Sequence, residues 1–549
     1  MRAENREIKE TIRGNVVDII NRRTYGAELT ISDGVIQHIE ETGRIEENFL
    51  IPAFIDAHVH IESSMVRPSA FAEAVVRHGT LAVVSDPHEI ANVMGIAGIE
   101  AMIEDAEGLP FYFRFGAPSC VPSTQQETSG AVLDVNDITT LLAREEIYYL
   151  SEMMNYPGVL NEQPEVMKKL EAAKKAGKPI DGHAPLLRGE ALNKYILSGI
   201  STDHETTSLD EGREKCTAGM HILIREGSAD QSFEKLIPLL REYPDQLMFC
   251  TDDAHPSTIL QGHINLLVKR ALTLGYDLYN VLRVASYNPA KHYRIPLGFL
   301  QRGDSADFLL VSDLESLNIQ STYYKGEAVF SHGKTFFPRK EAVDINNFQA
   351  KAIDKTDLEV AALSDTMRVI VCEDGSILTK EGQIQLKAGT KQVESDIEND
   401  ILKLVIVNRY RTAKPAVAFI KGTGLRRGAV AQSIMHDNHN IIAVGTNDDD
   451  LVEAINRIIV EKGGISVVCG EETTVLPLPI AGIMSPDSLE ETAKNYDLIA
   501  HKIKSLGTPL HSLQMTLSFM GLLVIPSLKL SDKGLFNVES FDFTDLFVV

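Results

Sequence analysis

The sequence predicts an α/β protein made of a TIM-like (β/α)8 barrel, a small flanking β-sandwich domain and a C-terminal α+β domain. Two observations lead to this fold class. Short apolar strands alternate with amphipathic helices from about residue 50 to 295, a pattern typical of a parallel sheet with crossover helices. Several of these strands end in histidines or carboxylates, and such a barrel collects its functional groups at the carboxyl ends of its strands.

The chain divides into three expected domains. Its 549 residues exceed what one hydrophobic core usually organises. Short β-rich runs with turn signals occur before residue 40 and again after residue 296, so we expect both flanks to build one small β domain. The expected domains are 1–50 with 296–340 (β domain), 51–295 (barrel) and 341–549 (C-terminal domain).

The run from Phe49 to His60 is predicted as one buried strand that ends in two histidines. Side chains alternate along a strand, so His58 and His60 point the same way. Two imidazoles at this spacing can hold one metal ion on a rigid apolar support. The alternative is that they are only polar ends of the strand, because a metal site needs several convergent ligands.

Four later strands also end in ligand-type residues. They are predicted over 146–152, 179–183, 200–205 and 246–253. A helix over 164–176, which starts with Pro164 and stops before Gly177, lies between the first and second of these strands, and another over 190–197 lies between the second and third. The residues at the strand ends are Glu152, His183, His204, and the pair Asp252 and Asp253.

Beyond residue 340 the sequence indicates mixed strands and helices. Strands are expected over 443–446 and 465–469, with a helix over 450–461 between them. The segment 421–424 resembles a phosphate loop only loosely, so we interpret it as a turn. The run from His436 to Asn440 is either a solvated turn or part of a site.

Composition narrows the function classes. The formal charge of -24 argues against nucleic acid or an anionic membrane as partner. The five cysteines are scattered and form no CxxC pair, which disfavours disulfides and thiolate zinc sites and fits a reducing cytoplasm. No apolar run approaches the roughly 18 residues of a membrane span, so we expect a cytoplasmic protein that is neither secreted nor anchored.

The strand-end residues supply nitrogen and oxygen ligands without sulfur, a set that suits manganese, ferrous iron or zinc. Six such residues are too many for one tetrahedral ion. Two ions that share a bridging carboxylate would use all of them and could lower the pKa of a bridging water to near neutrality. The six are His58, His60, Glu152, His183, His204 and Asp252.

This arrangement resembles the amidohydrolase superfamily, and within it most closely the adenine deaminase family. In the superfamily an HxH strand, a bridging group, two further histidines and a late aspartate occupy successive strand ends. The closer resemblance spans nearly the whole chain. It rests on His60–Met65, Asp86–Gly95, Glu152–Val159, Ile224–Ala229, Cys250–Asp253, His436–Asn440 and Leu476–Ser485.

The resemblance implies a binuclear metal centre and a small-molecule substrate. His58, His60 and Asp252 would hold one ion, His183 and His204 the other, and Glu152 would bridge them without the carboxylated lysine of many relatives. The implied ions are manganese first, with iron or zinc as alternatives. The implied reaction is hydrolysis of adenine to hypoxanthine and ammonia by metal-bound hydroxide, in purine salvage, by a homodimer.

The resemblance also implies roles for further residues. Asp252 would shuttle the proton, and strand alternation would turn Asp253 to the opposite face, where it holds a loop. His436 and His439 are expected near the mouth of the barrel. Other residues would either orient the base and protonate its ring or only support the site: Glu62, Ser63, Asp86, His88, Glu89, Arg225, Glu226 and Ser228.

The sequence leaves two other interpretations of the function open. A cyclic-amide hydrolase of the dihydropyrimidinase type would share the barrel and the metals, but Glu152 in place of a lysine and the C-terminal domain argue against it. A non-catalytic barrel scaffold would be expected to lack a metal ligand, and this sequence lacks none.

Overall fold

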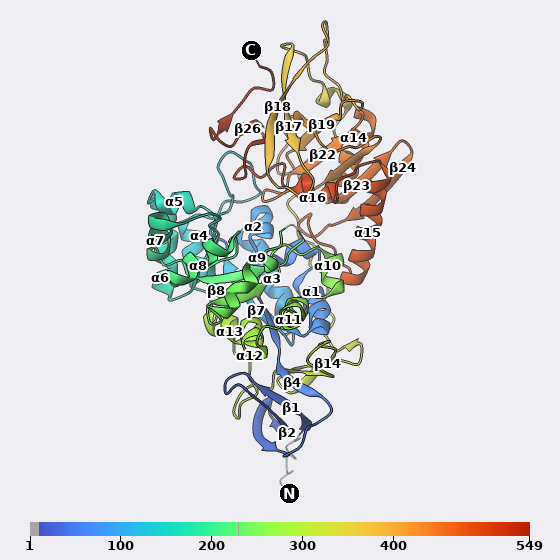
Figure 1. The fold of residues 1–549 in the computed structure, drawn as a ribbon. Helices are drawn as coiled ribbons and strands as arrows, with labels where there is room; N and C mark the ends of the chain where they lie inside the picture. Colours follow the sequence, from blue (N-terminus) through green and yellow to red (C-terminus); the bar gives the residue numbers. More distant parts are fainter. Residues whose placement is uncertain (1–9, 229, 549) are drawn as a thin grey trace.

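The computed structural model describes residues 10–228 and 230–548. Residue 229, which closes one of the segments that carry the resemblance, and the first nine residues lie outside this part. The molecule is elongated, with the N-terminal strands at one end, the barrel in the middle and the C-terminal domain at the other end (Figure 1). None of the helices within 10–228 and 230–548 is long and apolar enough to cross a membrane.

The middle of the molecule is the predicted barrel of parallel strands. A hydrogen bond from Ser201 N to Ile180 O (3.0 Å) joins a five-stranded and a three-stranded sheet, and one from Asp252 N to His58 O (2.9 Å) closes the ring. The eight strands are β5 (Phe54–Val59), β6 (Thr80–Ser85), β7 (Tyr112–Ala117), β8 (Ile147–Met153), β9 (Ile180–Gly182), β10 (Thr202–Asp203), β11 (His221–Arg225) and β12 (Leu247–Cys250).

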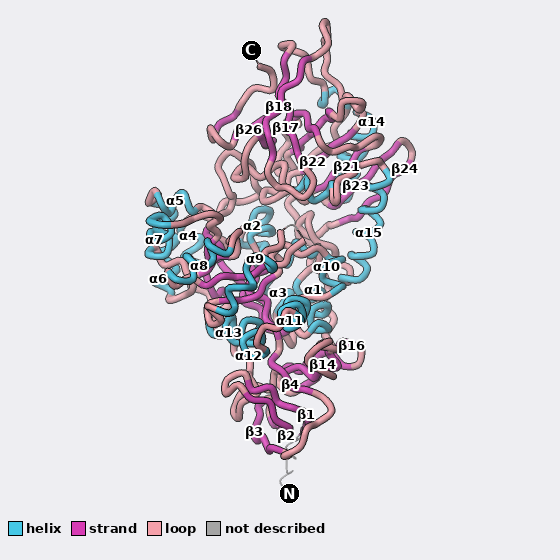
Figure 2. The backbone as a smooth tube through the Cα atoms, viewed as in Figure 1, coloured by secondary structure: helices cyan, strands magenta, loops and turns pink. Residues whose placement is uncertain are grey.

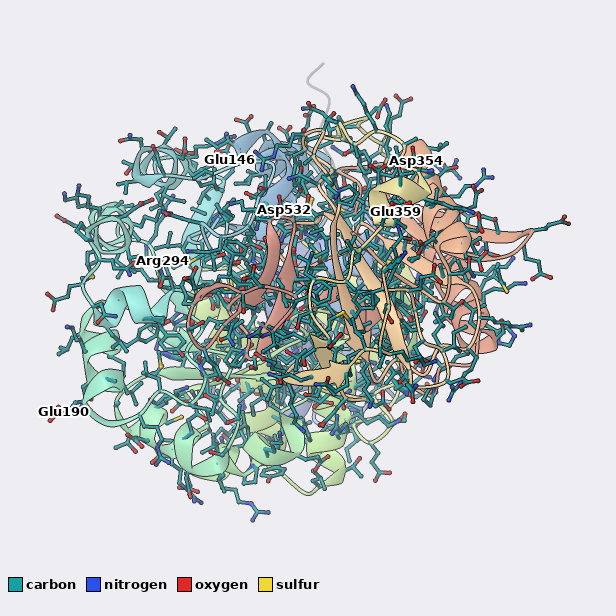
Figure 3. The ribbon with its side chains drawn as sticks, turned by 90° about the horizontal axis from the view of Figure 1, so that it is seen from above. Glu146, Glu190, Arg294, Asp354, Glu359 and Asp532 are labelled. Atoms are coloured by element: carbon teal, nitrogen blue, oxygen red, sulfur yellow. The ribbon has the colours of Figure 1, made fainter. Side chains whose placement is uncertain are left out.

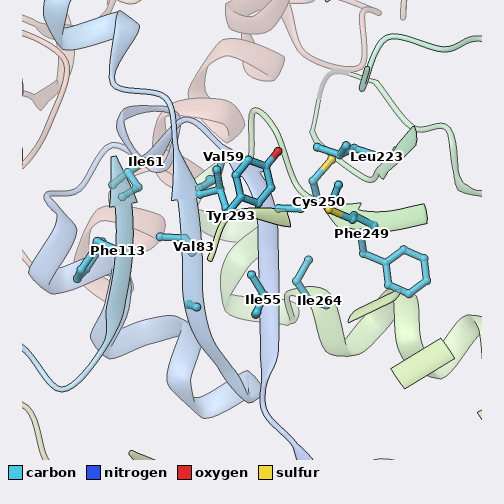
Figure 4. Packing of buried hydrophobic residues seen from close by; sticks show 14 of the residues in the cluster. Ile55, Val59, Ile61, Val83, Phe113, Leu223, Phe249, Cys250, Ile264 and Tyr293 are labelled. Atoms are coloured by element: carbon cyan, nitrogen blue, oxygen red, sulfur yellow. The ribbon is translucent and has the colours of Figure 1, made fainter. Parts of the chain in front are cut away.

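Helices cover the barrel, and side chains fill its interior. The predicted helix over 164–176 is confirmed as α6 (Pro164–Ala176), which ends at Gly177 in a left-handed conformation. Ile55, Val83 and Phe249 belong to the fully buried apolar core (Figure 4), and the ring of Phe249 lies 6.2 Å from that of Phe233 on the covering helix α9 (Phe233–Leu236). The other main helices are α1 (Pro68–Val75), α2 (His88–Met94), α3 (Ile96–Ala106), α4 (Val135–Leu142), α7 (Gly189–Leu197), α8 (Leu209–Thr217), α10 (Pro256–Gln261), α11 (Ile264–Thr273) and α13 (Asn288–His292).

The predicted strand over 49–60 is in fact two strands in two different sheets. β4 (Phe49–Pro52) pairs with strands of the N-terminal sheet, whereas β5 belongs to the barrel and ends at Val59. The chain changes sheets at Ala53, and the backbone of Phe54 then donates to Gly79 O (2.9 Å) in the barrel. The sequence pattern does not show this change of sheets, because both strands are buried and together form one unbroken apolar run.

The N-terminal sheet draws strands from both sides of the barrel sequence. Its order is β16-β15-β14-β13-β4-β1-β2-β3, and β4 pairs with both β1 and β13. The boundaries of the domains stay predictions. The strands are β1 (Glu10–Asp18), β2 (Arg23–Ser32), β3 (Val35–Glu41), β13 (Phe308–Val311), β14 (Ile319–Tyr324), β15 (Glu327–Ser331) and β16 (Lys334–Thr335).

The C-terminal domain contains a second eight-stranded sheet, of order β18-β17-β20-β19-β22-β21-β23-β24, with helices beside it (Figure 2). The predicted strands and helix correspond to β22 (Ile441–Gly445), β23 (Gly464–Cys469) and α14 (Asp448–Glu461). The remaining elements used below are β20 (Ala416–Lys421), β21 (Ala429–Gln432) and α15 (Leu489–Ser505).

The segment after β20 is a turn, as predicted. Gly422 and Gly424 have positive φ angles of 105° and 62°. Their backbone N–H groups both donate to the carboxylate of Asp400, each at 2.9 Å. A carboxylate of the protein therefore occupies the donors that a phosphate would need.

The exposed surface carries many acidic side chains, in keeping with the charge of -24. Glu190, Asp354 and Glu359 project outward in the view from above (Figure 3). Asp532 instead is buried, where its carboxylate accepts hydrogen bonds from Thr128 N of the barrel side (3.0 Å) and Asn408 Nδ2 (2.8 Å). The two domains are thus joined by buried polar contacts.

Candidate metal centre

The centre of the site is Glu152, near the end of β8. Its Oε2 atom lies 2.7 Å from His183 Nδ1 and 3.2 Å from His204 Nε2. Its other oxygen, Oε1, lies 3.5 Å from His60 Nε2. One carboxylate therefore faces histidines from three different strand ends.

Asp252 makes a second group with the histidines of β5. Its Oδ1 atom lies 3.4 Å from His58 Nε2 and 3.2 Å from His60 Nε2. His58 is fully buried, and within residues 10–228 and 230–548 neither of its ring nitrogens has a hydrogen-bond partner. A buried imidazole without a partner is costly unless a ligand pairs with it. The nitrogen and oxygen donors clustered here thus fit a divalent metal ion.

Asp252 reaches the histidines through its backbone conformation and not through strand alternation. β12 ends at Cys250, and Asp252 has a φ angle of 56°, in the left-handed region that aspartate tolerates better than most residues. The expected opposite faces of Asp252 and Asp253 do not hold, because the strand has already ended. Asp253 accepts a hydrogen bond from Ser63 Oγ (2.5 Å), while its carboxylate also lies beside His60 and Asp252.

Electrostatics keep both carboxylates ionised. Burial by itself raises the pKa of Glu152, but hydrogen bonds and charge from His183 and His204 outweigh this and hold it well below its usual value. For Asp252, burial is outweighed in the same way by Arg225 and the histidines of β5, and the pKa is again well below the ordinary one. Two buried anions at the centre of a histidine cluster are suited to binding cations.

Arg225, at the end of β11, fixes the outer oxygen of Asp252. Its guanidinium donates to Asp252 Oδ2 (2.7 Å) and Asp230 Oδ2 (2.5 Å) and pairs with Glu205. Sequence reasoning missed Glu205, although its position directly after His204 was a signal. Its Oε1 atom lies 3.7 Å from His204 Nε2.

Two residues predicted beside Arg225 make side-chain contacts with the helices that follow β11. Glu226 pairs with Arg270 and accepts a hydrogen bond from Phe233 N (3.0 Å). Ser228 Oγ contacts Thr258 Oγ1 (2.9 Å). Both contacts hold loops together, so the structure gives these residues a supporting position.

Asp86 and His88, which follow β6, join the cluster. His88 Nδ1 lies 3.4 Å from Glu152 Oε1 and 3.3 Å from Asp86 Oδ2. The backbone carbonyl of Asp86 lies 3.0 Å from His60 Nδ1 and so orients that ring. Both residues thus touch the metal ligands.

The two carboxylate oxygens of Glu62, which follows β5, differ in their hydrogen bonds. Its Oε1 atom accepts a hydrogen bond from Ile90 N (3.1 Å), and its buried Oε2 atom has no hydrogen-bond partner among the residues that the structure describes. Burial raises the pKa of Glu62 to about 7. An acceptor of this kind is available to a bound ligand.

Glu89, on α2, binds the C-terminal domain. Its two oxygens lie 2.5 Å from His436 Nδ1 and 2.5 Å from His439 Nε2. Burial lowers the pKa of His436, but the charge of Glu89 raises it more, to about 9, so the contact is an ion pair. The prediction that these two histidines lie near the barrel mouth is confirmed, since Glu89 Oε1 is 3.7 Å from His88 Nε2.

A buried lysine that sequence reasoning missed holds the loops that carry two of the ligands. Lys215 Nζ donates to Asp203 Oδ2 (2.9 Å) and to Ala184 O (2.8 Å). Asp203 also accepts from Ala184 N (2.8 Å), so the loops after β9 and β10 are tied together beside His183 and His204. No local sequence signal marks this contact, because it depends on the packing of α8.

Two family models match separate parts of the chain. A family model described as "Amidohydrolase family" matches residues 49–329. A second, described as "Adenine deaminase C-terminal domain", matches residues 376–542. Together they span the barrel and most of the C-terminal domain.

Curated relatives match the chain from end to end. A protein of Parabacteroides distasonis named "Adenine deaminase" is 62% identical over 98% of this chain and 98% of its own length. Proteins of the same name from Methanosarcina mazei and Borreliella burgdorferi are 50% and 46% identical, each over 97% of this chain and 99% of its own length.

Solved structures are similar to part of this chain at much lower identity. A beta-aspartyl dipeptidase from Fervidobacterium islandicum has 16% identity and a TM-score of 0.46, over 60% of this chain and 99% of its own. An N-acetylglucosamine-6-phosphate deacetylase from Thermotoga maritima has 15% identity and a TM-score of 0.44, over 59% and 100%.

The histidine and carboxylate cluster at the barrel mouth, the C-terminal domain clamped to it and the end-to-end similarity to curated relatives therefore have one explanation. The chain belongs to the adenine deaminase family, within the amidohydrolases.

Proposed function

We propose that this chain hydrolyses adenine to hypoxanthine and ammonia, in purine salvage. Water supplies the oxygen that replaces the exocyclic amine, and the amine leaves as ammonia. The observation that carries the proposal is the convergence of nitrogen and oxygen ligands on the unmodified carboxylate of Glu152, in a chain similar from end to end to adenine deaminases.

The proposed cofactor is a pair of divalent cations, manganese first, with iron or zinc as alternatives. His58, His60 and Asp252 would hold one ion, and His183 and His204 the other. The division is supported by Glu152, whose Oε1 faces His60 while its Oε2 faces His183 and His204. When bound, such ions make a water molecule acidic enough to act as a nucleophile near neutral pH.

Asp252 is our candidate for the group that moves the proton. One of its oxygens faces the histidines of β5, and Arg225 holds the other, so the carboxylate is fixed in place. It would take the proton of the attacking water and pass it to the ring nitrogen or to the leaving ammonia.

We propose that the remaining predicted catalytic residues contact the adenine ring. Asp86 and His88 form a pair beside Glu152. Glu62 offers a free oxygen, and Glu89 is held by two histidines. We assign these four to orienting the base and protonating its ring. A cytoplasmic location and a homodimer complete the proposal.

Ammonia release from adenine by the purified protein tests the reaction. The protein is reconstituted separately with manganese, iron and zinc, and a chelator-treated sample is the control. Ring opening of dihydrouracil is measured in parallel. The proposal expects metal-dependent ammonia from adenine and no ring opening; ring opening alone would make the chain a cyclic-amide hydrolase, and neither reaction would favour a scaffold.

A further inference from the structure

A small cavity of about 20 Å³ lies where the C-terminal domain meets the barrel. The barrel side of its wall includes Glu62, Met65 and Glu89. The C-terminal side consists of two isoleucines, Ile434 and Ile483, and the two histidines that bind Glu89.

The cavity borders the metal centre. Glu89, in its wall, lies 3.7 Å from His88, which in turn lies 3.4 Å from Glu152. Ser63, also in its wall, donates a hydrogen bond to Asp253 beside His60. The cavity is therefore within reach of a ligand that reacts at the metal centre.

The C-terminal part of the wall is held rigidly on the barrel. Glu89 binds His436 and His439. Ser485, two residues after Ile483, donates its backbone N–H to Met65 O (2.7 Å), and Tyr496 Oη lies 3.0 Å from His255 Nδ1. A wall fixed at three places does not yield easily to a larger ligand.

We infer that the C-terminal domain forms the outer wall of the substrate pocket, with Ile434 and Ile483 as specificity-determining residues against the five-membered ring of the purine. This inference rests on the proposed function. With the amine-bearing carbon C6 at the metal centre, C8 and N9 are the ring atoms farthest from it. Branched aliphatic side chains suit the flat apolar ring, and the free Glu62 Oε2 suits a ring N–H donor.

The size of the cavity predicts which methylated adenines are excluded. A space on the order of a water molecule admits the edge of a ring but no substituent on that edge. A methyl group at C8 or N9 would overlap the isoleucines, whereas one at C2 would not, because C2 lies in the six-membered ring. Shortening the isoleucines should therefore admit the first two substrates selectively.

The test uses the full-length, metal-loaded protein and its variants Ile434→Ala and Ile483→Ala. The matched control is Ile503→Ala, on α15, which is buried in the same domain and does not line the cavity. The kcat/KM values are measured for adenine and for its 2-, 8- and 9-methyl derivatives. Metal content and thermal melting show that each variant is folded and loaded.

The inference expects the ratio of kcat/KM for 8- or 9-methyladenine to that for adenine to rise about tenfold or more in the two wall variants, since a methyl-sized change in an apolar pocket has effects of that size. The ratio for 2-methyladenine and all ratios of the control should stay unchanged. Should the alanine variants fail to fold, Ile434→Val and Ile483→Val should give smaller rises in the same direction.

Ratios that move no more than those of Ile503→Ala, or that move equally for 2-methyladenine, overturn the inference. Failure of the proposed function looks different, because the wild-type protein would then release no ammonia from adenine itself.

Discussion

At the scale of single residues, the two oxygens of Glu152 divide the ligands into two sets, and this division makes a direct prediction. Glu152→Ala should lose both ions together, because the carboxylate contributes charge and a ligand atom to each. Metal content per chain, measured after dialysis, checks this. Glu127→Gln is the control, since Glu127 is equally buried but contacts Asn438 and Ser123. Two equivalents of metal retained by Glu152→Ala would remove the bridging role.

Asp252 and Asp253 are adjacent but differ in their contacts, so their variants should differ too. Asp252→Asn keeps one ligand oxygen and removes the basic site, and kcat should fall on the order of 10²–10⁴-fold at equal metal content. Asp253→Asn should lower kcat much less, because its main contact is the hydroxyl of Ser63. The reverse order at equal metal occupancy would move the proton-transfer role to Asp253.

The residues of the metal centre were predictable because the carboxyl ends of all barrel strands lie at the same end of the barrel. His58, His183 and His204 follow apolar strands, and the barrel brings such positions together whatever lies between them. Lys215 was not predictable, because its contact with Asp203 depends on how α8 packs beside β10. For His436 and His439 the sequence predicted only a position near the barrel mouth. Their contacts with Glu89 were not predicted, because they follow it by 347 and 350 residues.

At the scale of secondary-structure elements, the end of α13 packs against the start of β11. The rings of His292 and His221 lie 4.7 Å apart, on the side of the barrel away from the metal ligands. Burial, and then the charge of His221, lower the pKa of His292 to about 3. This histidine is therefore neutral in the folded protein over most of the acid range.

The sign of the resulting pH dependence follows from this lowered pKa. The unfolded chain protonates His292 as the pH falls below about 6.5, while the folded protein resists protonation until about 3. The stability contributed by the neutral ring is complete above pH 6.5 and is lost as the pH falls toward 3. Between pH 7.5 and 5, wild type should thus lose about 2 kcal/mol of stability relative to His292→Gln.

Urea unfolding at the two pH values measures this difference, with His511→Gln, at an exposed position, as the control. An equal loss in wild type and His292→Gln would show that this helix end does not contribute to acid sensitivity.

Element boundaries also show where sequence reasoning stops. The bounds of α6 follow from a proline at its start and a glycine after its end, which are local signals. The division between β4 and β5 has no local signal, because the residues on both sides of Ala53 are apolar and buried. Only the partners of each strand, far away in the sequence, distinguish the two sheets.

At the scale of the whole molecule, the barrel and the C-terminal domain should unfold as one unit. Glu89 forms a buried ion pair with His436, and breaking such a pair by removing one partner costs about 3–5 kcal/mol. The double variant His436→Gln, His439→Gln should therefore melt at a lower temperature and in two separated transitions. Differential scanning calorimetry measures this, with His501→Gln, exposed on α15, as control. A single transition at the wild-type temperature would show that the clamp does not couple the domains.

The clamp has a further consequence for how the protein is made. Synthesis proceeds from the N-terminus, so Glu89 leaves the ribosome 347 residues before its partner His436 exists. All six predicted ligands, from His58 to Asp252, are likewise translated before the C-terminal domain. A barrel that folds in that interval would have its mouth open to solvent, and the C-terminal domain would cover it only after all six ligands are in place.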